Sequence, residues 1–283
     1  MKLRFALALV VVVPAMALVA VAIVGNRASH HHVNQAYDRK MGGDSVGHRV
    51  PVLVELFTSE GCSSCPPADE LLMSLEQSQP VAGVEIIALS EHVDYWNRLG
   101  WTDPYSSAEF STRQNDYARI FQTDEVYTPQ MIVDGHSQFV GNNAAKASDV
   151  IGQSAHEAKA NVTIAASVAD QGSDSVTFDV KIDGFPQNWK GKSADVLLAI
   201  TESGLRSNVA AGENRGRRLT HTAVVRKINR LGSVDSKKDQ TFSVQPVVRV
   251  SKAWKRDNLK AVVFVQDHAT RQVLGAAALP FAK

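Results

Sequence analysis

The chain has 283 residues, of which 44% are hydrophobic and 21% charged, and its formal net charge is +1. This length allows two ordinary domains. The near-zero net charge argues against a generally basic surface, so no nucleic-acid partner is expected.

The N-terminus predicts export. Lys2 and Arg4 precede an uncharged apolar stretch over residues 5–24, about the length that crosses a bilayer as a helix. Residues 15–17 have signal-peptidase spacing, but the apolar stretch continues past them, which favours an uncleaved anchor. Residues 1–25 are therefore predicted to be a signal peptide or an inner-membrane anchor. In either case the remainder is expected to be extracytoplasmic, either periplasmic or secreted.

Residues 26–49 are polar and lack large apolar side chains, which predicts a flexible linker. The linker contains His30, His31 and His32. Three adjacent histidines can bind a metal loosely, but a solvated polar tract is the simpler interpretation.

Cys62 and Cys65 are the only cysteines, and they follow an apolar run that ends at Phe57. A disulfide that stabilises a fold usually joins distant segments, because its contribution grows with the loop it closes. This pair closes almost no loop. The spacing therefore indicates chemistry, in which one thiolate attacks and the other resolves the mixed disulfide or shares a metal ion.

Residues 50–160 are predicted to alternate between strands and helices in the order βαβαββα. The expected elements are a strand at 52–57, a helix at 66–78, a strand at 84–89, a helix capped by Ser106 with Glu109, a hairpin of 131–133 and 138–140 around Asp134-Gly135, and a last helix over 144–158.

This order, with the cysteine pair between the first strand and the first helix, resembles the thioredoxin fold. Thr128-Pro129 precedes the third strand, where thioredoxin-like proteins place a cis-proline facing the disulfide. Longer sequence segments resemble those of an uncharacterised family of exported bacterial thioredoxin-like proteins with a C-terminal β domain. These segments are residues 55–62, 90–96, 126–130, 212–217 and 264–267.

Two departures from thioredoxins are visible. Gly61 stands where thioredoxins usually carry a tryptophan, which removes an aromatic wall from the groove. Pro66 and Pro67 directly follow the second cysteine, so the helix is expected to begin later than in thioredoxin. Its terminus would then lower the pKa of Cys62 less effectively.

The candidate catalytic residues are Cys62, Cys65, Pro129 and Glu55. Cys62 is expected to be the more exposed cysteine and the nucleophile, and Cys65 the resolving thiol. Pro129 would align the partner chain. Glu55 shares a strand face with Leu53 and Phe57, and resembles the buried acid that exchanges a proton with the resolving cysteine in thioredoxins. A solvated Glu55 at a sheet edge is the alternative.

His92 follows the second strand at the sheet edge from which the cysteine turn emerges. It could tune a thiolate, or complete a copper or zinc site with Cys62 and Cys65. A hydrogen-bonded structural histidine is the third possibility. The aromatic residues at 95–101 are expected to pack as core or lid, with a binding groove for an apolar peptide as the alternative.

Residues 161–283 carry period-two patterns, which predict an antiparallel β-sandwich-like domain. The expected strands lie at residues 162–168, 176–182, 196–201, 221–228, 241–250, 259–266 and 272–278. The simpler interpretation of the basic loop at 206–230 is a solvated loop. The alternative hypothesis is that the loop covers the cysteines, where it lowers the thiol pKa or receives an acidic partner.

The predicted fold class is therefore an α/β thioredoxin-like domain followed by an antiparallel β-sandwich-like domain. The predicted function is an exported thiol-disulfide oxidoreductase that acts on protein thiols or disulfides without a cofactor. The alternatives are copper or zinc delivery through Cys62, Cys65 and His92, and a binding module in which the cysteines are dispensable.

Overall fold

The computed structural model describes residues 49–167 and 174–281. The predicted leader at 1–25, and the linker at 26–49 except for Arg49, lie outside the described residues. Within the described ranges, no helix is long and apolar enough to cross a membrane.

The elements of the first half follow the predicted order. They are β1 (Val50–Thr58), α1 (Pro66–Ser78), β2 (Val84–His92), the 3-10 turn η1 (Asn97–Leu99), α2 (Ala108–Phe121), β3 (Gln130–Val133), β4 (Ser137–Val140) and α3 (Ala144–Ser154). The N-cap of α2 is Ser107 and not the predicted Ser106, because the Ser107 hydroxyl oxygen accepts a hydrogen bond from the Glu109 amide. The hairpin is confirmed, since Asp134 and Gly135 between β3 and β4 both have the positive φ that a tight turn requires.

The second half is almost entirely strands. They are β5 (Asn161–Ser167), β6 (Ser175–Asp183), β7 (Ser193–Glu202), β8 (Leu205–Asn208), β9 (Arg218–His221), β10 (Val224–Asp235), β11 (Phe242–Val244), β12 (Val247–Arg249), the 3-10 turn η2 (Arg256–Asn258), β13 (Leu259–Asp267) and β14 (Val273–Pro280). The strand predicted at 241–250 is in fact two short strands.

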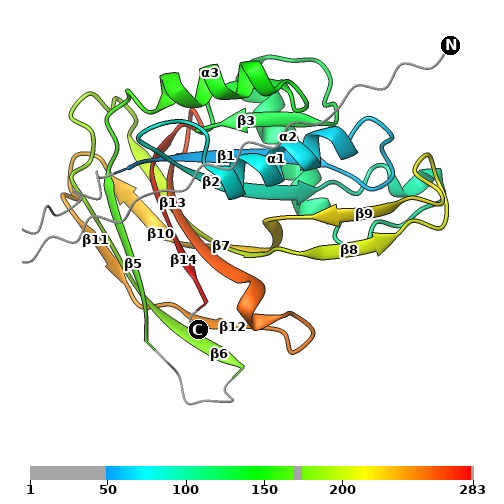
Figure 1. Ribbon diagram of the computed structural model, residues 1–283. Helices are drawn as coiled ribbons and strands as arrows, with labels where there is room; N and C mark the ends of the chain where they lie inside the picture. The colour runs from blue at the N-terminus through cyan, green and yellow to red at the C-terminus, as the bar shows by residue number, and fades with distance from the viewer. Residues whose placement is uncertain (1–48, 168–173, 282–283) are drawn as a thin grey trace, which may run out of the picture. The chain divides into compact units, whose positions relative to one another are not determined.

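The predicted fold class, with a thioredoxin-like domain and a separate β domain, is wrong. Strands from both halves form one mixed sheet of eight strands, in the order β14-β13-β7-β10-β2-β1-β3-β4 (Figure 1). The two halves join where Val224 of β10 lies opposite Ser90 of β2, and the Ser90 amide donates to the Ala223 carbonyl at 2.8 Å. The described residues of both halves accordingly belong to one compact unit.

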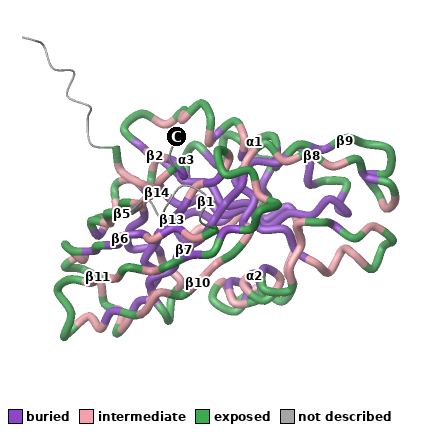
Figure 2. Tube along the Cα trace, turned by 90° about the horizontal axis from the view of Figure 1, so that it is seen from below, coloured by how far each residue is buried: buried purple, intermediate pink, exposed green. Residues whose placement is uncertain are grey.

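Each face of this sheet has its own cover. Helices α1 and α3 pack on the face that carries Val52, Val54 and Leu56. Helix α2 packs on the opposite face, where Leu53 shares a cluster with residues of β7, β13 and β14. Figure 2 shows α2 on one side of the buried strands and α1 and α3 on the other. The smaller sheet of β5, β6, β11 and β12 buries a further cluster against β7 and β13.

Candidate functional site

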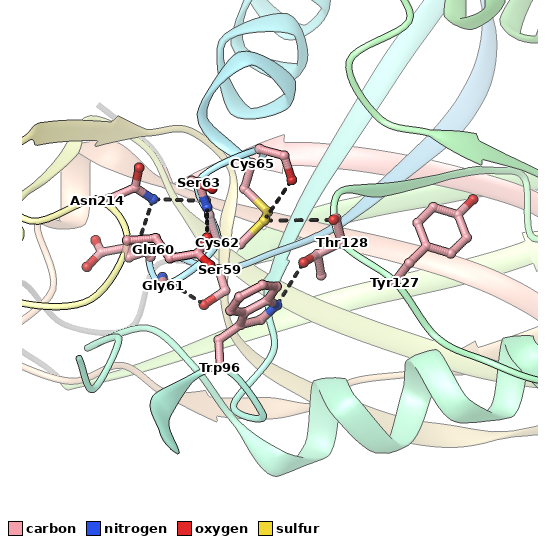
Figure 3. The surroundings of a disulfide bond; sticks show 12 residues. Ser59, Glu60, Gly61, Cys62, Ser63, Cys65, Trp96, Tyr127, Thr128 and Asn214 are labelled. Carbon is pink, nitrogen blue, oxygen red and sulfur yellow. Dashed lines mark hydrogen bonds between the residues drawn. A yellow bond between two sulfur atoms is a disulfide. The ribbon is translucent and has the colours of Figure 1, made fainter. Parts of the chain in front are cut away.

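The cysteine turn connects β1 to α1. Cys62 and Cys65 form a disulfide, and Cys65 is the residue directly before the helix (Figure 3). Pro66 and Pro67 occupy the first helical positions, where a missing amide hydrogen costs nothing. The helix therefore begins at once, and the later start expected from the two prolines is wrong.

Both cysteines are buried, with 0% of each residue exposed. The expectation that Cys62 is the more exposed of the two is therefore wrong. Its surroundings are nevertheless polar. Cys62 Sγ lies 3.3 Å from Ser64 Oγ and 3.8 Å from the Thr128 carbonyl oxygen. Because Ser63 and Ser64 are exposed, the disulfide lies just beneath the surface rather than in the apolar core.

The peptide bond between Thr128 and Pro129 is cis. The Thr128 carbonyl lies beside Cys62, so the structure groups Cys62, Cys65 and Pro129 as the sequence predicted. Trp96 donates from Nε1 to Thr128 Oγ1 at 2.8 Å (Figure 3). A Cβ atom at Gly61 would lie 3.0 Å from the Trp96 Cβ. Trp96 thus packs close to Gly61 and supplies an aromatic side chain beside the disulfide. It comes from the segment after β2, whereas the cysteine turn follows β1.

The loop between β8 and β9 binds the cysteine turn. Asn214 is fully buried, and its side-chain amide donates to the carbonyl oxygens of Glu60 and Cys62, each at 2.9 Å (Figure 3). Glu213 accepts the Ser63 amide at 2.9 Å, and the hydrogen bonds from Ser63 lower the pKa of Glu213. The predicted basic loop does reach the cysteines, but it touches their turn through an amide and a carboxylate.

Two buried histidine-carboxylate pairs lie beside this turn. His92 Nδ1 is 2.7 Å from Asp103 Oδ2, and His221 Nε2 is 2.9 Å from Glu60 Oε1. The two imidazole rings meet edge to face, with centroids 4.8 Å apart. Burial raises the pKa of Asp103, but His92 together with hydrogen bonds from the Glu60 and Tyr105 amides outweighs burial, so that pKa lies below its usual value.

Asp69 is a buried acid on the cysteine helix that the sequence analysis missed. It lies one turn after Cys65, and its amide donates to the Cys65 carbonyl at 3.1 Å. Burial raises the pKa of Asp69 to about 7, although the nearby His221 and Thr58 partly oppose the rise. Four atoms here have no hydrogen-bond partner among the described residues: Asp69 Oδ1, Thr58 Oγ1, His92 Nε2 and His221 Nδ1.

Glu55 is buried on the predicted face, but its partners are not the cysteines. Its Oε1 accepts two hydrogen bonds from Arg113, at 2.5 and 2.7 Å, and its Oε2 accepts the Tyr117 hydroxyl. Glu91 lies beside it, 3.4 Å from Arg113 Nε. Burial raises the pKa of Glu91 well above its usual value, and Glu55 adds to the rise while Arg113 opposes it. Glu55 therefore belongs to an ion network on the α2 face.

The structure does not bring His92 together with the cysteines as metal ligands. His92 Nδ1 is paired with Asp103, and its ring packs against Tyr105 and His221. Throughout residues 49–167 and 174–281, no three histidine, cysteine or acidic side chains are placed to hold one metal ion. His92 thus has the hydrogen-bonded position that was one of its three predicted roles.

A family model described as a protein of unknown function, DUF1223, matches residues 53–266. The chain belongs to the DUF1223 family. No curated protein matches it. An Agrobacterium tumefaciens crystal structure is 28% identical, with a TM-score of 0.62, and the alignment covers 83% of this chain and 96% of that one. HBP35 of Porphyromonas gingivalis is 15% identical, with a TM-score of 0.59 and coverage of 82% and 75%, and shows the fold alone.

In this DUF1223 chain, the missed site residues had weak sequence signals. Asn214 lies between Gly212 and Gly216, which both have positive φ and indicate a tightly shaped loop. Asp69 is four residues after Cys65, a spacing that places both side chains on one helix face. Neither signal reveals that the two residues meet the cysteine turn, because that depends on how β9 packs beside α1.

Proposed function

We propose that this DUF1223 protein catalyses thiol-disulfide exchange outside the cytoplasm, with Cys62 and Cys65 as the redox pair. One observation carries the proposal: the cysteines form a disulfide three residues apart, beside the Thr128 carbonyl at a cis-proline. A link over so short a separation contributes little chain entropy to stability. An exported location is compatible with a persistent disulfide.

In the proposed reaction, a partner thiolate attacks Cys62 Sγ. The Cys62–Cys65 bond breaks, a mixed disulfide forms on Cys62, and Cys65 leaves as a thiolate that takes up a proton. A second partner thiolate then attacks the partner's sulfur, which releases an oxidised partner and the Cys62 thiolate. The reverse direction oxidises Cys62 and Cys65 thiols at the expense of a partner disulfide.

Asp69 replaces Glu55 as the proposed proton-exchange group. It is one helical turn from Cys65, has a pKa of about 7 because it is buried, and retains one oxygen without a hydrogen-bond partner among the described residues. A carboxyl group with a pKa near the working pH can both give and take a proton.

The test is exchange catalysis by the full-length protein. The purified protein is reduced, freed of reductant and mixed with a peptide disulfide, and mixed disulfides are followed by mass spectrometry. In the wild type the Cys62 thiolate should attack the peptide disulfide and Cys65 should resolve the mixed disulfide, which releases two peptide thiols and forms the Cys62–Cys65 disulfide. Cys65→Ser should stop at the mixed disulfide and keep the peptide on Cys62, whereas Cys62→Ser should form much less of it. The proposal is overturned if the wild type reduces the peptide disulfide no faster than the background rate measured with the Cys62→Ser/Cys65→Ser double variant.

A further inference from the structure

The β8–β9 hairpin, whose loop bonds the cysteine turn through Asn214, exposes several arginines. In this pair Arg206 lies opposite Thr220, and Asn208 lies opposite Arg218. These four residues share the outer face of the ribbon, because side chains alternate along a strand. All four are exposed, whereas Leu219 and His221 on the other face are buried. Arg206 and Arg218 therefore project from one outer surface.

Arg215 adds a third positive charge from the connecting loop. It is exposed, and it is the residue next to Asn214, which bonds the Cys62 carbonyl. We call Arg206, Arg215 and Arg218 the arginine surface. Within the described part of the chain none of the three has an ion-pair partner. The loop's only acid, Glu213, already accepts the Ser63 amide.

A short apolar element lies beside the same loop. An ideal Cβ atom at Gly212 would lie 3.9 Å from the carbonyl oxygen of Leu99 in η1. Leu99 is 46% exposed, one of four large hydrophobic residues exposed among the described residues. The loop that bonds the cysteine turn thus carries positive charge and lies beside an exposed apolar residue, a combination typical of a polypeptide docking surface.

Resting on the proposed function, we infer that the arginine surface selects partner polypeptides whose reactive cysteine is flanked by aspartate or glutamate. The overall charge of +1 gives no long-range field, so the selection acts locally. At physiological ionic strength, charges are screened beyond about 8 Å. Only acidic residues of the partner that dock within this distance of the arginines therefore respond to them, and the arginines steer these residues into encounter and hold them there.

The experiment compares reduction of the Cys62–Cys65 disulfide by three capped peptides: Glu-Glu-Cys-Glu-Glu, Gln-Gln-Cys-Gln-Gln and Lys-Lys-Cys-Lys-Lys. Each rate is divided by the rate of that peptide with hydroxyethyl disulfide, a neutral reference that removes differences in thiol pKa. The wild type should prefer the acidic over the basic peptide by on the order of tenfold at low salt. In 0.5 M NaCl the preference should largely disappear.

The test variant is Arg206→Glu/Arg215→Glu/Arg218→Glu, which should abolish or invert the preference. The matched control is Lys190→Glu/Lys192→Glu/Lys237→Glu, which makes the same charge change at three exposed lysines elsewhere. The control should retain the preference. Reduction by dithiothreitol and the urea midpoint verify that each variant is folded.

Two results would overturn the inference: equal normalised rates for the three peptides with the wild type, or equal losses of preference in the arginine and lysine variants. The salt series on the wild type tests the inference even if the triple variant does not fold. A disulfide that resists all three peptides and dithiothreitol would instead overturn the proposed function, so the two failures are distinguishable.

Discussion

The side chain of Asn214 donates a 2.9 Å hydrogen bond to the carbonyl oxygen of Cys62, across 152 positions of the sequence. The same amide group also binds the Glu60 carbonyl. The conformation of the cysteine turn is therefore held by a residue from the second half of the chain. This coupling makes the turn sensitive to a residue that bears no reactive group.

We expect Asn214→Ala to loosen the cysteine turn. Two buried carbonyl oxygens lose their donor, which should lower the free energy of unfolding by about 2–3 kcal/mol. The disulfide should also be reduced several-fold faster by dithiothreitol, because the turn opens more easily. Urea unfolding and reduction kinetics measure the two effects. The control is Asn142→Ala at an exposed asparagine; similar losses in both variants would contradict the role given to Asn214.

Asp69→Asn should change how stability depends on pH. In the folded protein Asp69 keeps its proton up to a pH of about 7, whereas an unfolded aspartate loses it near 3.8. The folded state therefore binds more protons across this interval, so this group's contribution to stability falls as the pH rises from about 4 to 7. The loss approaches a few kcal/mol, at about 1.4 kcal/mol for each pH unit between the two pKa values.

The asparagine variant carries no such penalty. Urea unfolding of the oxidised wild type and of Asp69→Asn should show the variant gaining stability relative to the wild type between pH 4 and pH 8. A difference that does not change with pH would mean that Asp69 is ionised in the folded protein throughout.

Arg113→Met should be strongly destabilising, because it leaves Glu55 and Glu91 buried without their cation. The expected loss is about 3–5 kcal/mol at pH 7 in urea unfolding. Adding Glu55→Gln and Glu91→Gln should recover most of it.

Arg271→Met is the control for that series, since it breaks a partly exposed pair with Asp116 and should cost about 1 kcal/mol or less.

Glu55→Gln alone should leave the pH profile of thiol exchange unchanged. A shifted profile would restore Glu55 as the proton-exchange group.

Gly61→Ala should displace Trp96, because the new methyl group would lie 3.0 Å from the Trp96 Cβ. We expect a loss of about 1–3 kcal/mol from overpacking, together with altered tryptophan fluorescence as the bond to Thr128 is disturbed. Gly152→Ala in α3 is the control. Its nearest contact is 4.0 Å away, so the alanine should stabilise the helix by about 0.5–1 kcal/mol. Equal effects of the two substitutions would contradict the close contact at Gly61.

The local elements of the first half were predictable because each rests on a short-range signal. A short apolar run with β-branched residues predicted β1, helical spacing predicted α1, and Asp134-Gly135 predicted a hairpin. The sheet order was not predictable in the same way. Period-two patterns show that β7 and β13 are strands, but they carry no information about which edge those strands join. The resemblance to a two-domain arrangement therefore led to the wrong fold class.

At the site, the cysteine pair and Pro129 were predictable, because their spacing and order relate directly to the turn between strand and helix. Asn214 and Glu213 were not, since their contacts depend on the placement of a distant hairpin. Glu55 was placed on the correct face, but the sequence offered no means of pairing it with Arg113, 58 residues away. Burial of Cys62 likewise follows from the covering loop and not from the motif.

The short junction between Ser90 and Val224 has a practical consequence for dissecting the protein. A fragment that stops after α3 would leave β2 as an unpaired edge strand. Leu53 and Leu89 would also lose the apolar residues of the second half that share their cluster. Such an edge is a template for self-association. A version of this chain truncated after α3 should thus precipitate and not fold as a small redox domain. Transferring the cysteine motif to another protein would also require transfer of the β8–β9 hairpin.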